Sequence, residues 1–315
     1  MSQFLYTHVL RHPATLILTG LVLACGGETK EQKVVTVAQA DPVETSVTPQ
    51  PVKTPETKTE QPKYTNVKYN DAETVFRKGT YSDAAEMFGS YVIEHPDNPA
   101  GHYMLGLSAW KSGDHKRAVE ALQRAVELDS TSGKAQINLA RVLIEQGRNE
   151  EAVPHVQKSI ELKPESPEGY RVLGNVQTNL GRIDDAIEAY RQALIRNDQD
   201  SWTMNNYGLL LIGLGRCEEA LQPLARAVEL KPNSAKFQNN FGIALEQVGY
   251  LGSAKQAFNA AVTVDSGYTK AKVNLERVQS VLGETEGEFI DVDALTRSFV
   301  EEILKWRTAG KSDDR

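Results

Sequence analysis

Glycine recurs along this chain at a fixed interval. Seven glycines stand 34 residues apart with no insertion or deletion between them: Gly79, Gly113, Gly147, Gly181, Gly215, Gly249 and Gly283. A series of alanines runs in phase, five residues later: Ala84, Ala118, Ala152, Ala186, Ala220 and Ala254. An unbroken period of this length predicts a stack of repeated units, each packed only against its neighbours, rather than a single globular core.

Large and small residues alternate within each unit at helical spacing. When a unit is counted from Thr65, position 7 is mostly large and apolar, as at Leu105 and Leu139, and position 8 is mostly small, as at Gly106 and Ala140. This pattern predicts two helices per unit that approach closely at the small residues. The glycine at position 15 is expected to end the first helix, because glycine adopts the left-handed cap conformation without strain.

The pattern resembles the tetratricopeptide repeat, most clearly in "YMLGLSAWKSGDHKRAVEALQRAVELD" and "NNYGLLLIGLGRCEEALQPLARAVELKPN". The resemblance implies an all-α fold, a right-handed α-solenoid of helix-turn-helix units with a C-terminal capping helix. It places the repeat array at 65–283, with six repeats at 65–98, 99–132, 133–166, 167–200, 201–234 and 235–268 and a half repeat at 269–283. Asp71 stands where the first repeat needs a large apolar residue, so we expect its first helix to be frayed.

Residues 1–24 are predicted to be a secretory signal, because Arg11 precedes the short apolar run "PATLILTGLVLA". The sequence "LVLACGG" also resembles the bacterial lipobox, in which the signal is cut before the cysteine and the thiol carries diacylglycerol. By that resemblance Cys25 is lipidated; the alternative is an ordinary signal with a chance cysteine. Gly-Gly after the cysteine favours the outer membrane. We therefore expect a lipid-anchored protein of the bacterial cell envelope that faces the periplasm.

Two further segments flank the repeats. Residues 25–64 are rich in proline and threonine, and 26–63 contain no Leu, Ile, Phe, Tyr or Trp, which predicts a disordered tether. Residues 284–315 begin acidic and then carry one apolar stripe at helical spacing: Val292, Leu295, Phe299, Ile303 and Trp306. We expect a helix that caps the exposed end of the last repeat; the alternative is a helix that docks a partner protein.

No chemistry-bearing constellation is apparent in the sequence. The six histidines have no metal-ligand spacing, and the chain has no phosphate-binding glycine loop and no nucleophile elbow. We therefore predict no catalytic residues, no metal and no cofactor, and hence a protein that is not an enzyme. The formal net charge of −7 argues against nucleic acid as a partner.

Asparagine dominates position 6 of the units, on the helix face that lines the concave side of such solenoids. The row comprises Asn70, Asn138, Asn206, Asn240 and Asn274. It resembles the asparagine ladder of the O-linked N-acetylglucosamine transferases, where amides can pair with a peptide backbone. The alternative is that these asparagines only follow the repeat consensus. If the row binds a partner, replacement of Asn206 and Asn240 by alanine should weaken partner binding and leave thermal unfolding nearly unchanged.

Arg171, Asn175, Asn206 and Lys236 together resemble the carboxylate clamp of chaperone-binding tetratricopeptide proteins. Asn240 stands where that clamp has its final basic residue, so the clamp is incomplete. A pocket of this kind would hold a terminal carboxylate or an acidic side chain. In the N-terminal half, Tyr103 and Trp110 are candidate anchors for partner side chains.

These features together predict a membrane-anchored scaffold or adaptor that binds a protein or peptide in its concave groove. The architecture resembles the pilotin and pilus-biogenesis lipoproteins of type IV and tight-adherence pili, which implies a part in assembling a pilus or secretion complex. Two alternatives stay open: a periplasmic chaperone or scaffold for polysaccharide export or outer-membrane assembly, and a regulator of a peptidoglycan enzyme. The sequence does not determine the oligomeric state.

Overall fold

The computed structural model describes residues 64–309, which form fourteen α-helices and no strand. Residues 1–63 and 310–315 lie outside the described part, and with them Cys25, the signal and most of the tether. The helices are α1 (Tyr69–Arg77), α2 (Tyr81–Glu94), α3 (Pro99–Ser112), α4 (His115–Leu128), α5 (Gly133–Glu145), α6 (Asn149–Leu162), α7 (Pro167–Asn179), α8 (Ile183–Arg196), α9 (Ser201–Gly213), α10 (Cys217–Leu230), α11 (Ala235–Val248), α12 (Leu251–Val264), α13 (Thr269–Leu282) and α14 (Val292–Ala309). The expected all-α solenoid is confirmed.

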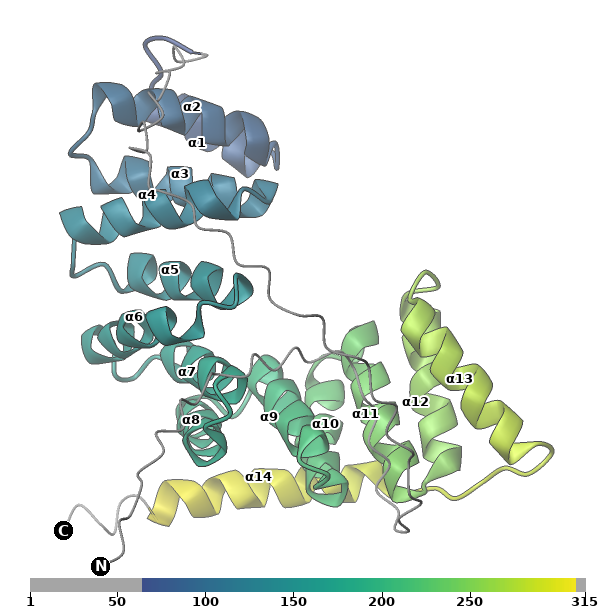
Figure 1. Cartoon of the computed structure of the whole chain (residues 1–315). Coiled ribbons are helices and arrows are strands. Elements are labelled where there is room, and N and C mark those ends of the chain that lie inside the picture. The colour runs from purple at the N-terminus through teal and green to yellow at the C-terminus, as the bar shows by residue number, and fades with distance from the viewer. Residues whose placement is uncertain (1–63, 310–315) are drawn as a thin grey trace, which may run out of the picture.

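The odd-numbered helices up to α13, here the first helices, alternate with the even-numbered ones up to α12, the second helices. Each first helix packs against the second helix of its own repeat, and that second helix packs against the first helix of the next repeat. Figure 1 shows the pairs stacked along a path that turns near α7–α9. The first helices from α3 onward begin at Pro99, Gly133, Pro167, Ser201, Ala235 and Thr269, the first residues of the repeats counted from Thr65. In the first repeat, α1 begins only at Tyr69, and Asp71 is exposed.

The glycine series ends the first helices. All seven glycines have positive φ, between 57° at Gly283 and 103° at Gly249. In five repeats, the backbone N–H of the residue after this glycine donates to the carbonyl of the residue five positions earlier. An example is the bond from Asp114 to the carbonyl of Ala109, at 2.9 Å. This geometry satisfies carbonyls that the helix end leaves free, and it turns the chain into the second helix. The predicted role of these glycines is therefore confirmed.

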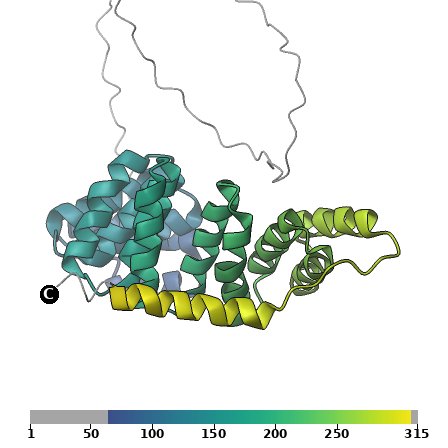
Figure 2. The same cartoon turned by 90° about the horizontal axis from the view of Figure 1, so that it is seen from below.

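The predicted C-terminal helix exists, but its expected position over the end of the last repeat is wrong. Helix α14 packs against α8 and α10, and it makes no backbone contact with α13. Figure 1 shows it running back beneath α8–α10, and Figure 2 shows it crossing that face of the stack. At its C-terminal end, the Arg307 guanidinium donates to the Ile195 carbonyl and pairs with Asp198, both at 2.9 Å.

The apolar stripe of α14 is its buried face. Phe299 and Ile303 are each 1% exposed and belong to one core with Tyr190 and Leu194 of α8. Trp306 packs edge-on against Phe299, with the ring centroids 5.9 Å apart. The stripe was thus correctly predicted to be buried, although it packs on the second helices of repeats four and five, where Trp306 also contacts Tyr207 of α9.

The face of α13 that a following second helix would cover is polar, although Val273 and Val281 are exposed elsewhere on this helix. Lys272, Glu276 and Gln279 occupy positions 4, 8 and 11 of the half repeat, and all three are exposed. In the sixth repeat the residues at positions 8 and 11, Gly242 and Leu245, are buried. A polar outer face allows the terminal helix of a solenoid to stay in water. Helix α13 therefore ends the array by itself, which leaves α14 free to pack elsewhere.

The segment between α13 and α14 is held at the start of α12. The carbonyl of Glu288 accepts hydrogen bonds from the backbone N–H groups of Gly252 and Ser253, at 2.9 and 3.2 Å. The Ser253 hydroxyl in turn accepts from the N–H of Ile290 at 3.1 Å. These bonds supply partners for amides that the first turn of a helix cannot satisfy itself. They direct the chain away from α13 and toward the second helices.

Candidate functional site

The position-6 asparagines join neighbouring repeats. The Nδ2 of Asn240 donates to Oδ1 of Asn205 at 2.8 Å, and the Nδ2 of Asn274 donates to Oδ1 of Asn239 at 2.9 Å. Asn138 makes the equivalent bond to the hydroxyl of Tyr103, at 3.0 Å. In each pair the acceptor stands 35 residues earlier, at position 5 of the preceding repeat. From the third repeat onward the row is thus a set of bonds between repeats, in which each asparagine already uses one amide hydrogen.

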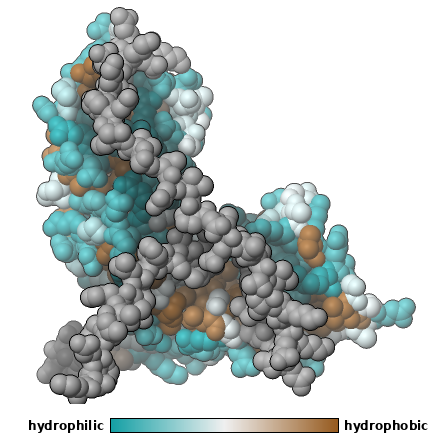
Figure 3. Space-filling view, viewed as in Figure 1, coloured by the Kyte–Doolittle hydropathy of each residue, from teal (hydrophilic) through white to brown (hydrophobic). Residues whose placement is uncertain are grey.

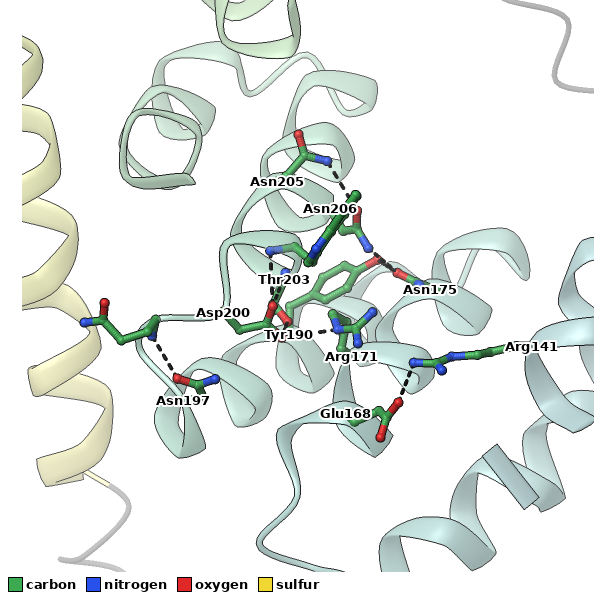
Figure 4. A network of polar contacts seen from close by, with 12 residues as sticks. Arg141, Glu168, Arg171, Asn175, Tyr190, Asn197, Asp200, Thr203, Asn205 and Asn206 are labelled. Carbon is green, nitrogen blue, oxygen red and sulfur yellow. Dashed lines mark hydrogen bonds and ion pairs between the residues drawn. The ribbon is translucent and has the colours of Figure 1, made fainter. Parts of the chain in front are cut away.

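Repeats four and five are joined by a related network, shown in Figure 4. The Nδ2 of Asn206 donates to Oδ1 of Asn175 at 2.9 Å, and the Tyr190 hydroxyl donates to the same oxygen, also at 2.9 Å. Burial raises the pKa of Tyr190 to about 12, so its hydroxyl is neutral and keeps its proton at physiological pH. Asn70, in the first repeat, has no preceding repeat to join, and its side chain is exposed.

The residues that resemble a carboxylate clamp do not offer a free cation at Arg171. Its Nε lies 3.2 Å from Oδ2 of Asp200, and the two side chains are only 22% and 13% exposed. Asp200 also accepts from the backbone N–H groups of Trp202 and Thr203, which start α9. The positive charge of Arg171 is therefore balanced within the solenoid. Lys236 is exposed on α11.

The two aromatic candidates also connect repeats. The Trp110 indole N–H donates to Oε2 of Glu145 at 2.6 Å, which links α3 to α5. The Tyr103 hydroxyl accepts from Asn138, and both aromatic side chains are half-buried. Part of each ring still faces solvent, so these residues combine a structural contact with an accessible apolar surface.

A hollow beside the asparagine row opens on the first helices of repeats three to five. Its volume is about 720 Å³, and its lining includes Ile144, Asn175, Ile183, Asn206, Leu209 and Leu214. Leu209 and Leu214 are 41% and 37% exposed, although both are leucines. Figure 3 shows hydrophobic residues gathered where α8–α10 lie. We name this hollow the α9 groove.

The leucines of the α9 groove were not among the residues predicted from sequence. The signal was present in the run "YGLLLIGLG" of repeat five, which holds more apolar residues than one face of a helix can bury. The tetratricopeptide pattern accounts for Tyr207, Gly208 and Leu211, and it leaves Leu209 and Leu214 without a core position. Their exposure became visible only when the neighbouring helices were placed.

Replacement of Asn240 by alanine is expected to lower the free energy of unfolding by about 1–3 kcal/mol, because it leaves the Asn205 carbonyl without its donor. Asn205 is 5% exposed, so water does not readily replace that bond. This replaces the expectation that alanine at Asn206 and Asn240 would leave unfolding unchanged. Urea unfolding of Asn240→Ala, with Asn70→Ala as the matched position-6 control, tests it; equal effects of the two substitutions would contradict it.

The described residues offer neither a membrane span nor a metal site. Within residues 64–309, no helix is both long and apolar enough to span a bilayer. The same residues contain no cluster of three or more His, Cys, Asp or Glu side chains that could hold a metal ion.

Comparisons with known proteins agree with this architecture. Three tetratricopeptide-repeat family models match residues 69–133, 109–176 and 168–199. Peroxisome biogenesis protein 5 of Arabidopsis thaliana is 34% identical over 62 residues, which is 20% of this chain and only 8% of that protein's length. That match therefore concerns a short part of the relative and carries no argument about its activity.

Solved structures show the same fold at low sequence identity. The APC/C hetero-tetramer Cut9-Hcn1 matches with a TM-score of 0.58 and 19% identity, over 66% of this chain and 41% of that chain. A tetratricopeptide repeat protein from Parabacteroides merdae matches with a TM-score of 0.56 and 15% identity, over 67% and 82% of the two chains. The period, the helix pairs, the family models and these structures together show that the chain contains tetratricopeptide repeats and that residues 64–309 form an all-α solenoid.

Proposed function

We propose that this protein is a scaffold of the bacterial cell envelope, anchored to a membrane by a lipid on Cys25, that assists assembly of a multiprotein complex. It binds segments of partner proteins along its first helices. Tetratricopeptide repeats are interaction modules, and the described residues hold no second kind of domain. These facts support a scaffold rather than an enzyme; turnover of an envelope substrate by the purified protein would contradict the proposal.

The observation that carries the proposal is the position of α14. It packs on the second helices α8 and α10, and its backbone contacts no first helix, although the Trp306 ring reaches Tyr207 of α9. An amphipathic C-terminal helix could instead have occupied the binding face of the solenoid. Because it does not, the α9 groove remains accessible, with two leucines exposed in it.

Cys25→Ala is expected to abolish incorporation of labelled fatty acid and to move the protein from the membrane to the soluble fraction. The physical reason is that the thiol is the attachment point that the lipobox resemblance implies, and the described helices offer no membrane span. Metabolic labelling and membrane fractionation of cells make the test. Cys217→Ala is the control, and continued membrane attachment of Cys25→Ala would refute the lipid anchor.

Assembly of a pilus or secretion complex is the first candidate for the scaffold's task, and its support is the combination of lipobox, tether and repeats. Polysaccharide export, outer-membrane assembly or regulation of a peptidoglycan enzyme are the alternatives. A photocrosslinking residue at Leu209 or Val273, both exposed on first helices, should capture the partner in cells. A secretin as the main product supports the first candidate. Products from the control site Leu304 on α14, with none from the first helices, would refute binding along this face.

A further inference from the structure

The α9 groove has no charged side chain in its lining. The residues around it are aliphatic, amide, hydroxyl or glycine. At its rim, the Nδ2 of Asn179 donates to Oδ1 of Asn149 at 3.1 Å, which pairs two neutral groups. Two charged residues close to these asparagines in sequence, Arg182 and Glu150, form an ion pair at 2.9 Å and neutralise each other.

The polar floor of the groove is also neutral. Asn175 and Asn206 are held by one hydrogen bond, and Tyr190 donates to Asn175 with a hydroxyl that stays protonated. Arg171, a cation that acts on Tyr190 of this floor, is paired with Asp200. A carboxylate placed here would lose its hydration without gaining a free positive charge, which makes its binding unfavourable.

We propose that the α9 groove binds an uncharged apolar side chain, such as leucine, isoleucine, methionine or phenylalanine, from an extended segment of a partner protein. This inference rests on the proposed function and specifies the chemistry of its partner. The exposed faces of Leu209 and Leu214 bury the apolar side chain of the partner. The remaining hydrogen-bonding groups of the amides on the floor are available to the backbone of the bound segment. The groove therefore selects against a terminal carboxylate, contrary to what the clamp-like residues suggest.

The chain's own tether is a poor occupant. Residues 26–63 contain no Leu, Ile, Phe, Tyr or Trp, so they lack the large side chains that a groove of about 720 Å³ would accommodate. The occupant is accordingly a segment of another protein. Competition by added unlabelled full chain would reveal the contrary case, in which a second copy fills the groove.

The test uses the full chain and a phage-displayed library of random 12-residue peptides. Selected peptides should contain large apolar residues and be depleted of Asp, Glu, Lys and Arg around them. Amidating the C-terminus of a selected synthetic peptide should change its Kd by less than about twofold, whereas the double variant Leu209→Gln/Leu214→Gln should weaken it by about tenfold or more. Leu304→Gln, a leucine 50% exposed on α14, is the matched control. Thermal unfolding verifies that each variant is folded.

The outcomes separate this inference from the proposed function. Enrichment of acidic peptides, or strong dependence on a free carboxylate, overturns the inference. Binding that is insensitive to the double variant Leu209→Gln/Leu214→Gln also overturns the inference. If that binding is weakened instead by substitution of Tyr103 or Trp110, the scaffold proposal stands. Enrichment of no peptide by any variant overturns both. Gain of affinity for glutamate-containing peptides on Asn179→Lys, at the rim, would further support recognition by charge in this groove.

Discussion

Phe299→Ala is expected to lower the stability of the C-terminal half of the solenoid by about 3–5 kcal/mol, or by the full docking energy of α14 if that is smaller. Phe299 is 1% exposed and lies in one core with residues of α8, α9 and α10. Truncation of its ring removes buried apolar contacts and leaves a cavity beside Trp306. Urea unfolding measures the loss, and amide hydrogen exchange locates it.

The location of the exchange is the sharper result. If α14 packs on the second helices, protection should fall in α8 and α10, the helices it contacts, while α13 stays unchanged. A helix that capped the last repeat would give the opposite pattern, with loss in α13. Leu304→Ala is the matched control on the same helix, because Leu304 is 50% exposed and its truncation should change stability by less than about 0.5 kcal/mol.

Gly208→Ala is expected to cost about 1–3 kcal/mol, because a methyl group at this position would overlap the side chain of Leu224. Leu224 is fully buried, so it has no room to move aside. Glycine at position 8 is thus required by the close approach of α9 and α10. Thermal and urea unfolding of the purified variant measure the cost.

The same helix offers a control of the same chemistry. Gly213 also lies in α9, and a methyl group added there would meet nothing within 4 Å. Gly213→Ala is therefore expected to be neutral or stabilising by up to about 1 kcal/mol, because alanine favours the helical backbone. Equal destabilisation by both substitutions would show that helix packing at position 8 is not the cause.

The repeat units were predictable because their determinants are local and recur. Each glycine at position 15 needs only its own backbone conformation, and each small residue at position 8 faces a partner 16 residues later in the same unit, as Gly208 faces Leu224. Short-range constraints of this kind can be read from one sequence without knowledge of the tertiary structure. The helix boundaries follow from them.

The candidate site was predictable in part. The asparagine row was recognised from the sequence. The sequence could not reveal that the side-chain amides of Asn240 and Asn274 each donate a hydrogen bond to the preceding repeat. Those bonds depend on the distance between adjacent first helices, which is set by packing. The same holds for Arg171, whose pairing with Asp200 spans 29 residues and neutralises one of the two cations of the clamp-like set.

The sequence by itself determined the stack of helix pairs, because the helix-ending glycine and the small residues beside it recur with a period of 34 residues. It also determined that α14 has one apolar face, since a stripe at helical spacing must be buried somewhere. Only the tertiary structure decided where. The face of α13 that a further helix would cover is polar, and the Glu288 carbonyl is held at the start of α12, so the apolar stripe lies on α8 and α10. An apolar stripe predicts that this face is buried, but it does not identify the surface that covers it. The hydrophobic effect is non-directional, so any apolar surface of matching shape can bury the stripe.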